Sequence, residues 1–271
     1  MAKGGYQRQR LQAKKDAERR ARKRARRNKL LGQWAIGIAV LALLGTVLGV
    51  TLTGGKKKAA ANPSTSPSTS PIPTVTTTCT KPGPSNVGKK TFASPPCIFI
   101  DPSKTYTATL TTSMGVIKVK LFASTAPNTV NNFVFLALNK FYDGSIFHRV
   151  IPDFGGEKGT DMIQGGDAVK RDGTGGPGYT FNDENPIPLT KDGYLAMANG
   201  GPNSNGSQFF FLSGPDTQLN QPATCPGGNC YNVFGQVTSG LNVISAIAHV
   251  QRDSSDKPLK PVTLISVKIA S

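Results

Sequence analysis

Apolar and polar residues alternate along two stretches in the middle of the chain. Residues 105–112 read TYTATLTT and residues 115–122 read GVIKVKLF, with apolar side chains at every second position over most of each run. A period of two is typical of a strand with one buried face. Ser113 and Met114 lie between the runs and form a turn together with Gly115, so the pattern predicts two strands joined by a tight turn.

The pattern then changes to a helical period within residues 124–144. Apolar side chains recur three or four positions apart, at Val130, Phe133, Val134, Ala137 and Phe141. Ser124 or Thr125 is suited to cap the N-terminus, and Pro127 is suited to the first turn. We therefore predict a helix in this segment.

Short apolar runs separated by Gly, Asn and Pro follow this helix. They span residues 147–151, 162–164, 194–198, 208–212 and 233–237. A second helix is predicted over residues 241–250 and a final strand over residues 262–270. Many short strands and only two helices indicate a mainly β protein, either a barrel or a sandwich.

A long apolar run, residues 30–53, precedes the strands and contains no charged residue. About 20 apolar residues suffice to cross a bilayer as a helix, and Trp34 is suited to the interface. One alternative is a helix buried in a protein core, and another is a signal peptide cleaved near Ala59–Ala61. The length of the run and Lys56–Lys58 directly after it favour an uncleaved transmembrane anchor.

Positive charge is concentrated at the N-terminus. Residues 1–29 carry thirteen Lys or Arg and two acidic residues, whereas residues 59–271 contribute only +3 to the total of +17. The positive-inside rule then predicts a cytoplasmic tail, a single-pass anchor in the cell membrane and an extracytoplasmic remainder. RNA or ribosome contact through the basic tail is the alternative, but a nucleic-acid partner is not expected for the folded part.

The segment between the anchor and the strands is divided into two parts. Residues 54–78 are rich in Pro, Ser and Thr and predict a disordered, extended stalk. Residues 79–103 form a lead-in that begins with a cysteine.

The four cysteines fall into two local pairs, Cys79 with Cys97 and Cys225 with Cys230, and outside the cytoplasm disulfides are the default. A zinc site is the alternative, but Cys79 and Cys97 lie too far apart in the sequence to form one half of such a site. No metal is therefore expected.

Several motifs in residues 104–271 occur in the order found in one family. FHRVIPDF (147–154), MIQGGD (162–167), GTGGPGYTFNDEN (173–185), LAMANGGPNSNGSQFFF (195–211) and VFGQV (233–237) resemble the cyclophilins, which are peptidyl-prolyl cis-trans isomerases. The resemblance implies a closed eight-stranded antiparallel β-barrel capped by two helices. It also implies proline-containing polypeptide substrates and no cofactor. The order of tail, anchor, stalk and outer domain resembles bacterial membrane-anchored members.

The resemblance also assigns site residues one by one. Arg149 matches the catalytic arginine, and His148 and Gln164 match residues beside it. The expected substrate-binding residues are Phe154, Met162, Ala198, Asn199, Gln208, Phe210, Leu219 and Tyr231.

A physical argument explains an arginine among apolar residues. An amide resists rotation by about 18–20 kcal/mol because its nitrogen shares a lone pair with the carbonyl. In the twisted state that pair is localised on nitrogen, so a cationic donor aimed at the nitrogen binds this state more strongly than either planar state. An apolar wall can meanwhile hold the proline ring.

The chain departs from the family in four places, one of which is segment 221–230, longer than usual and with its own cysteine pair. Gly155–Asp161 is inserted between Phe154 and Met162, so that Asp161 competes with Phe154 for the site position and the insertion is expected to form a lip over the groove. Gln218 replaces a tryptophan associated with cyclosporin, which predicts weak cyclosporin binding. Tyr231 replaces a histidine.

Two functional hypotheses follow from the resemblance and these departures. The first is an isomerase that accelerates the folding of extracytoplasmic proteins. The second is a weakly active or inactive membrane-tethered module that binds proline-containing segments.

Overall fold

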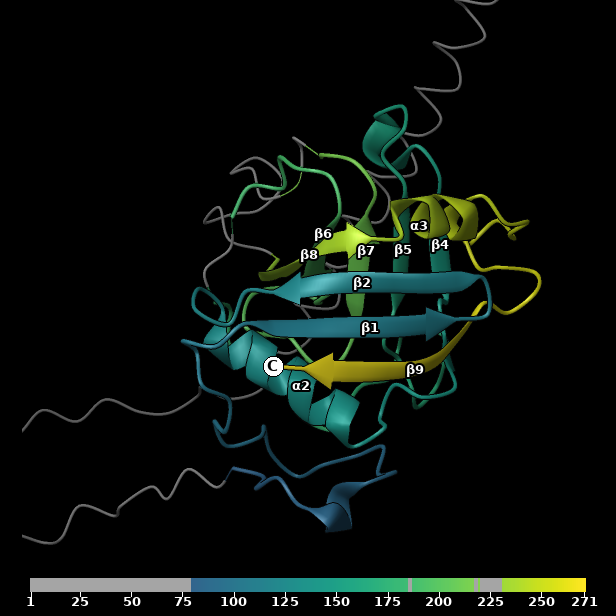
Figure 1. The fold of residues 1–271 in the computed structure, drawn as a ribbon. Coiled ribbons are helices and arrows are strands. Elements are labelled where there is room, and N and C mark those ends of the chain that lie inside the picture. Colours follow the sequence, from purple (N-terminus) through teal and green to yellow (C-terminus); the bar gives the residue numbers. More distant parts are fainter. Residues whose placement is uncertain (1–78, 185–186, 217–218, 220–230) are drawn as a thin grey trace, which may run out of the picture. The chain divides into compact units, whose positions relative to one another are not determined.

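A computed structural model describes residues 79–184, 187–216, 219 and 231–271 (Figure 1). The strands are β1 (Tyr106–Thr112), β2 (Gly115–Leu121), β3 (Ser145–Ile146), β4 (Arg149–Ile151), β5 (Met162–Gly165), β6 (Tyr194–Met197), β7 (Phe209–Leu212), β8 (Val233–Ser239) and β9 (Thr263–Ala270). The helices are α2 (Pro127–Leu138) and α3 (Leu241–Ala248), with short 3-10 turns η1 (Pro84–Asn86) and η2 (Phe154–Gly156).

The predicted tail (1–29), anchor (30–53) and stalk (54–78) lie outside the described residues, as do Gln218 and the Cys225–Cys230 pair. Within the described part of the chain, no helix is both long enough and apolar enough to cross a membrane.

One antiparallel sheet contains all nine described strands in the order β3-β9-β1-β2-β8-β6-β7-β5-β4. The sheet is curled, so that β1, β2 and β9 run across the direction of β4, β5 and β7 (Figure 1). The mainly β fold with two helices is confirmed. Nine strands are described where eight were expected, because one extended segment is divided into β3 and β4.

The two edge strands, β3 and β4, are consecutive parts of one extended segment. This segment pairs with β9 at its start and with β5 at its end. Between them the Phe147 N–H donates to the Val262 carbonyl and the His148 N–H donates to the Gln164 carbonyl, both at 3.0 Å. The apolar pattern showed only one run here, which is why the extra strand was missed.

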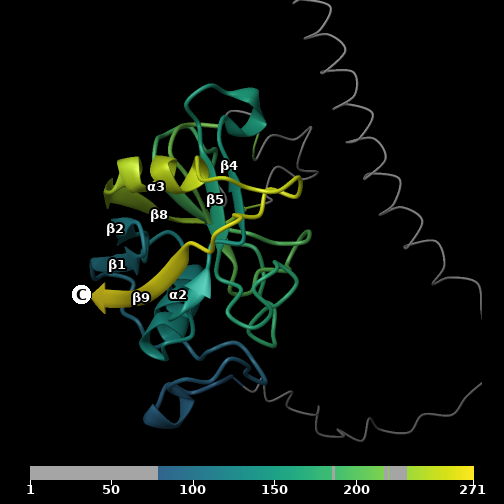
Figure 2. The same ribbon diagram turned by 90° about the vertical axis from the view of Figure 1, so that its right-hand side faces the viewer.

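The core lies inside the curl of the sheet and is rich in aromatic residues. Phe133 on α2 contacts Tyr142, Phe209 and Phe234, with ring centroids 5.2–5.8 Å apart. The helices α2 and α3 lie at opposite ends of the curled sheet (Figures 1 and 2), and both contribute residues to this core. Phe133 on α2 therefore packs against both β7 and β8 on the inner face of the sheet.

The first turn of α2 is capped differently from the prediction. The N-cap residue is Ala126, which makes no capping hydrogen bond through its side chain, so the assignment of Ser124 or Thr125 was wrong. The helix also ends at Leu138, earlier than the apolar period suggested.

The carboxylate of Glu184 supplies the missing cap. It accepts hydrogen bonds from the backbone N–H of Asn128 at 2.9 Å and of Thr129 at 2.7 Å. A carboxylate at a helix N-terminus is favoured by the helix dipole and satisfies free N–H groups. The partner lies 55 residues along the chain from Thr129, beyond the reach of a local capping rule.

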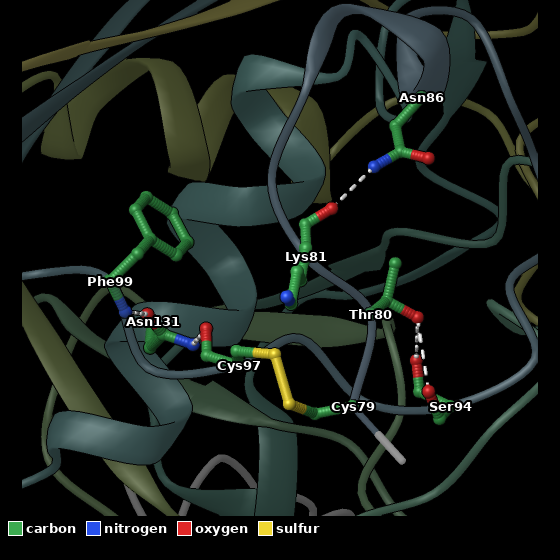
Figure 3. The surroundings of a disulfide bond; sticks show 8 residues. All are labelled: Cys79, Thr80, Lys81, Asn86, Ser94, Cys97, Phe99 and Asn131. Carbon is green, nitrogen blue, oxygen red and sulfur yellow. Dashed lines mark hydrogen bonds between the residues drawn. A yellow bond between two sulfur atoms is a disulfide. The ribbon is translucent and has the colours of Figure 1, made fainter.

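The lead-in is closed by a disulfide and fastened to α2. The predicted Cys79–Cys97 bond is confirmed (Figure 3). The side-chain amide of Asn131 donates to the Cys97 carbonyl at 3.1 Å, and its oxygen accepts from the Phe99 N–H at 3.0 Å. The ring of Phe99 also lies edge-on to that of Phe135. The lead-in is thus packed on α2 and is part of the folded unit.

Candidate active site

A cavity of about 190 Å³ lies against the outer face of β4, β5 and β7. Its lining contains nine of the eleven site residues expected from the sequence: Arg149, Phe154, Met162, Gln164, Ala198, Asn199, Phe210, Leu219 and Tyr231. The structure therefore brings most of the expected residues together, and their individual roles stay predictions.

The strand register explains this convergence. Arg149 on β4 is paired with Gln164 on β5, which is paired with Phe210 on β7. Residues paired across neighbouring strands point to the same face of the sheet. Met162 lies two positions from Gln164 and therefore shares this face. A cation, an amide and two apolar side chains are thus set side by side by backbone pairing alone.

The aromatic wall of the cavity is formed by Phe210 and Tyr231. Their rings meet edge-on, with centroids 5.4 Å apart. The tyrosine that replaces the family's histidine therefore stands at the cavity. Leu219 completes the apolar side, and its N–H donates to the carboxylate of Asp216 at 3.0 Å. Asp216 was not singled out from the sequence because it carries no motif of its own.

The Arg149 side chain is 45% exposed and lies beside a second arginine and a carboxylate. Its Nε is 3.9 Å from Asp256, whose other oxygen accepts from Arg252 Nε at 3.2 Å. The backbone of Val150 also donates to the Asp256 carbonyl at 2.8 Å. The loop after α3 thus sits against Arg149 and limits where its guanidinium can go.

Phe154, and not Asp161, occupies the site position. The insertion is closed at its base, where the Phe154 N–H donates to the Thr160 carbonyl at 2.6 Å. The Asp161 carboxylate is buried and accepts from the Asp153 N–H at 3.3 Å, while the Asp161 N–H donates to the Ser213 hydroxyl. None of residues 155–161 lines the cavity, so the expected lip is not formed there.

Gln208 is placed in an adjoining cavity and reaches the first through Gln164. The Gln164 Nε2 donates to the Gln208 side-chain oxygen at 3.0 Å. The second cavity, about 350 Å³, is lined in part by residues 173–177 and shares Gln164, Ala198 and Asn199 with the first. The site is therefore an elongated groove with an arginine near one end, a shape suited to an extended peptide.

His148 is the one expected site residue that the structure does not bring into either cavity. It is only 6% exposed, and among the described residues neither ring nitrogen has a hydrogen-bond partner. Successive side chains of a strand point to opposite faces, so Arg149 in the groove turns His148 away from it. Its assignment to catalysis gains no support from this placement.

Burial lowers the pKa of His148 below its ordinary value of 6.5, although Asp167 and Asp172 oppose the shift and Arg149 and Lys257 add to it. The folded state thus binds the proton less well than the unfolded state. The stabilising contribution is complete above about pH 6.5 and is lost as the pH falls, by at most about 1.4 kcal/mol per pH unit.

We expect the free energy of unfolding, measured with urea, to decrease between pH 7 and pH 5, and we expect His148→Phe to flatten that decrease. His249 is the second of the two histidines and its side chain is 59% exposed. His249→Gln is therefore the matched control and should keep the decrease. The same slope in His148→Phe as in the unaltered chain would contradict the assignment.

Comparison with known proteins places residues 107–269 within one sequence family, described as cyclophilin type peptidyl-prolyl cis-trans isomerase/CLD. The chain is 42% identical to peptidyl-prolyl cis-trans isomerase A of Mycobacterium tuberculosis over 188 residues, covering 62% of this chain and 94% of the relative. It is also 42% identical to peptidyl-prolyl cis-trans isomerase ppi1 of Schizosaccharomyces pombe, covering 58% of this chain and 94% of that protein.

Solved structures show the same likeness. A crystal structure of a Cryptosporidium parvum cyclophilin type peptidyl-prolyl cis-trans isomerase matches with a TM-score of 0.54 at 30% identity, covering 62% of this chain and 99% of that one. A second structure of that protein, in the presence of the dipeptide Ala-Pro, matches with a TM-score of 0.52 at 31% identity, covering 61% and 99% of the two chains.

Proposed function

The chain belongs to the family of cyclophilin-type peptidyl-prolyl cis-trans isomerases, and from this premise we propose that it accelerates rotation about X-Pro bonds by an arginine-assisted mechanism. The observation that carries the proposal is the shared cavity of Arg149, Met162 and Phe210. It combines one cationic donor with an apolar surface, which are the two elements that a twisted prolyl amide needs.

The mechanism requires no proton transfer. Met162, Phe210 and Leu219 hold the proline ring, while the Arg149 guanidinium meets the amide nitrogen as its lone pair localises. This contact is stronger in the twisted state than in either planar state, and only such differential binding lowers the barrier. Proline suits the scheme because its nitrogen carries no hydrogen.

The substrates we propose are proline-containing polypeptides, since the groove extends past the proline pocket into the second cavity. One related enzyme was crystallised in the presence of Ala-Pro. Uncatalysed X-Pro isomerisation takes tens to hundreds of seconds and can limit folding. Acceleration of slow folding steps is therefore the proposed role.

We further propose that these substrates are extracytoplasmic and that residues 30–53 anchor the enzyme in the cell membrane. The uncharged run, the basic residues before it and the Cys79–Cys97 disulfide support this location. Protease added to intact cells should remove residues 79–271 and spare residues 1–29. Protection of the folded domain would contradict the proposal.

The activity is tested by isomerisation of a proline tetrapeptide with the full-length chain. We expect conversion well above the buffer blank, at a rate proportional to enzyme concentration. Binding of the peptide without any acceleration would overturn the enzyme proposal and support a binding module instead. Cyclosporin should inhibit weakly, because Gln218 replaces the tryptophan associated with its binding.

A further inference from the structure

Asp167, two residues after the end of β5, lies outside both cavities, yet it organises the loop that borders the groove. Its side chain is fully buried. The carboxylate accepts five backbone hydrogen bonds at 2.9–3.2 Å, from Val169, Lys170, Asp172, Gly173 and Gly175. Burial would raise the pKa of Asp167, but backbone N–H donors, those of Lys170 and Gly175 foremost, outweigh it and lower the pKa to about 2. The group is therefore ionised at neutral pH.

Two carbonyls of this loop fix the side chain of Gln208. Gln208 Nε2 donates to the carbonyls of Gly173 and Gly175, each at 2.8 Å. A carbonyl accepts only from a donor, so the amide nitrogen must face the loop and the Gln208 oxygen must face Gln164. Gln164 in turn presents its own nitrogen at 3.0 Å. The orientation of both amides follows from the position of the loop.

The loop can take this position only because glycines stand at its two contact points. A Cβ on Gly175 would lie 2.3 Å from the Asp167 carboxylate, and one on Gly173 would lie 3.0 Å from His148 Nε2. The backbone thus approaches the carboxylate on one side and the buried imidazole on the other. The N–H groups of both glycines donate to the Asp167 carboxylate at 3.0 Å, which holds the two residues whose carbonyls receive the Gln208 amide.

We propose that Asp167 is a positioning residue of the active site, which acts through the 167–175 loop and Gln208 to orient Gln164 beside Arg149. This inference rests on the proposed isomerase function. Asp167 itself touches neither cavity; its effect is transmitted by the hydrogen bonds from the loop to Gln208 and from Gln164 to Gln208. A carboxylate is needed because one amide oxygen in its place cannot accept all five bonds.

A double-mutant cycle on the full-length chain tests the proposal. Asp167→Asn is expected to lower kcat/KM for the proline tetrapeptide on the order of ten-fold, mainly in kcat, because small misplacements of an aligned group are costly. Gln208→Ala should cause a comparable loss. If Asp167 acts through Gln208, the double variant should lose no more than Gln208→Ala alone. Losses that simply multiply would overturn the proposal.

Asp172→Asn is the matched control. It removes the same charge from the same loop, but the Asp172 carboxylate bonds to Thr174 and not to Gln208. We expect its kcat/KM to stay close to that of the unaltered chain. A loss as large as that of Asp167→Asn would show a general effect of loop charge and would overturn the proposal.

A second measurement decides the matter if Asp167→Asn does not fold. In the unaltered chain, the two side-chain amide protons of Gln208 each face a carbonyl acceptor. They should therefore exchange with solvent much more slowly than those of the exposed Gln251. Equal exchange rates would overturn the proposal. This arm needs no turnover, so it separates failure of the positioning role from failure of the proposed activity.

Discussion

Arg149→Ala is expected to lower kcat/KM for a proline-containing peptide about 100-fold or more, the size of effect seen when one donor to a developing charge is removed. The loss should fall mainly on kcat, because the contact is strongest in the twisted state and ring binding by Met162 and Phe210 remains. Stability should change little, since the side chain is 45% exposed and its nearest carboxylate, Asp256, is 3.9 Å away. Peptide isomerisation and urea unfolding measure the two effects separately.

Arg252→Ala is the control for this variant. Arg252 carries the same charge and pairs with the same carboxylate at 3.2 Å, but it does not line the cavity. We expect it to retain nearly full activity. Arg149→Lys adds a finer test, because lysine keeps the charge and loses the planar fork of donors. Unchanged turnover in Arg149→Ala would refute the mechanism and leave the family membership intact.

The placement of the site was largely predictable because the motifs carry both residue identity and register. Arg149, Gln164 and Phe210 occur in three separate apolar runs, and the strands pair so that these residues form one row. The same rule of alternation was available for His148. It predicts that a neighbour of Arg149 points to the opposite face, and the buried imidazole agrees with it. The resemblance was followed there in place of the strand geometry.

Other features depend on contacts that no local pattern encodes. Glu184 caps α2 across 55 residues, and Asp167 accepts five backbone bonds from the loop whose carbonyls receive Gln208. The length of the insertion after Phe154 likewise did not show which end of it would meet the cavity. In each case the missing information was which backbone groups need a partner once the tertiary structure forms.

Two neighbouring phenylalanines on β7 separate the fold from the site. The ring of Phe209 is fully buried and packs edge-on against Phe133 and Tyr142, with centroids 5.8 and 5.5 Å away. Phe210 instead lines the cavity, where it meets Tyr231. Because side chains alternate along the strand, two adjacent phenylalanines have different roles: Phe209 packs in the core and Phe210 lines the groove.

We expect Phe209→Ala to lower the free energy of unfolding by about 3–5 kcal/mol, because it leaves a cavity among aromatic rings that cannot collapse around it. Its kcat/KM per folded molecule should stay near that of the unaltered chain. Phe210→Ala should lose less stability, because its side chain already borders an open cavity. Its peptide turnover should fall at least about ten-fold, because the proline ring loses the apolar surface of Phe210 against which it is buried. Urea unfolding and tetrapeptide isomerisation of both variants measure this pair of effects. The opposite pattern, with activity lost in Phe209→Ala and stability in Phe210→Ala, would mean that the groove is not where the proline is held.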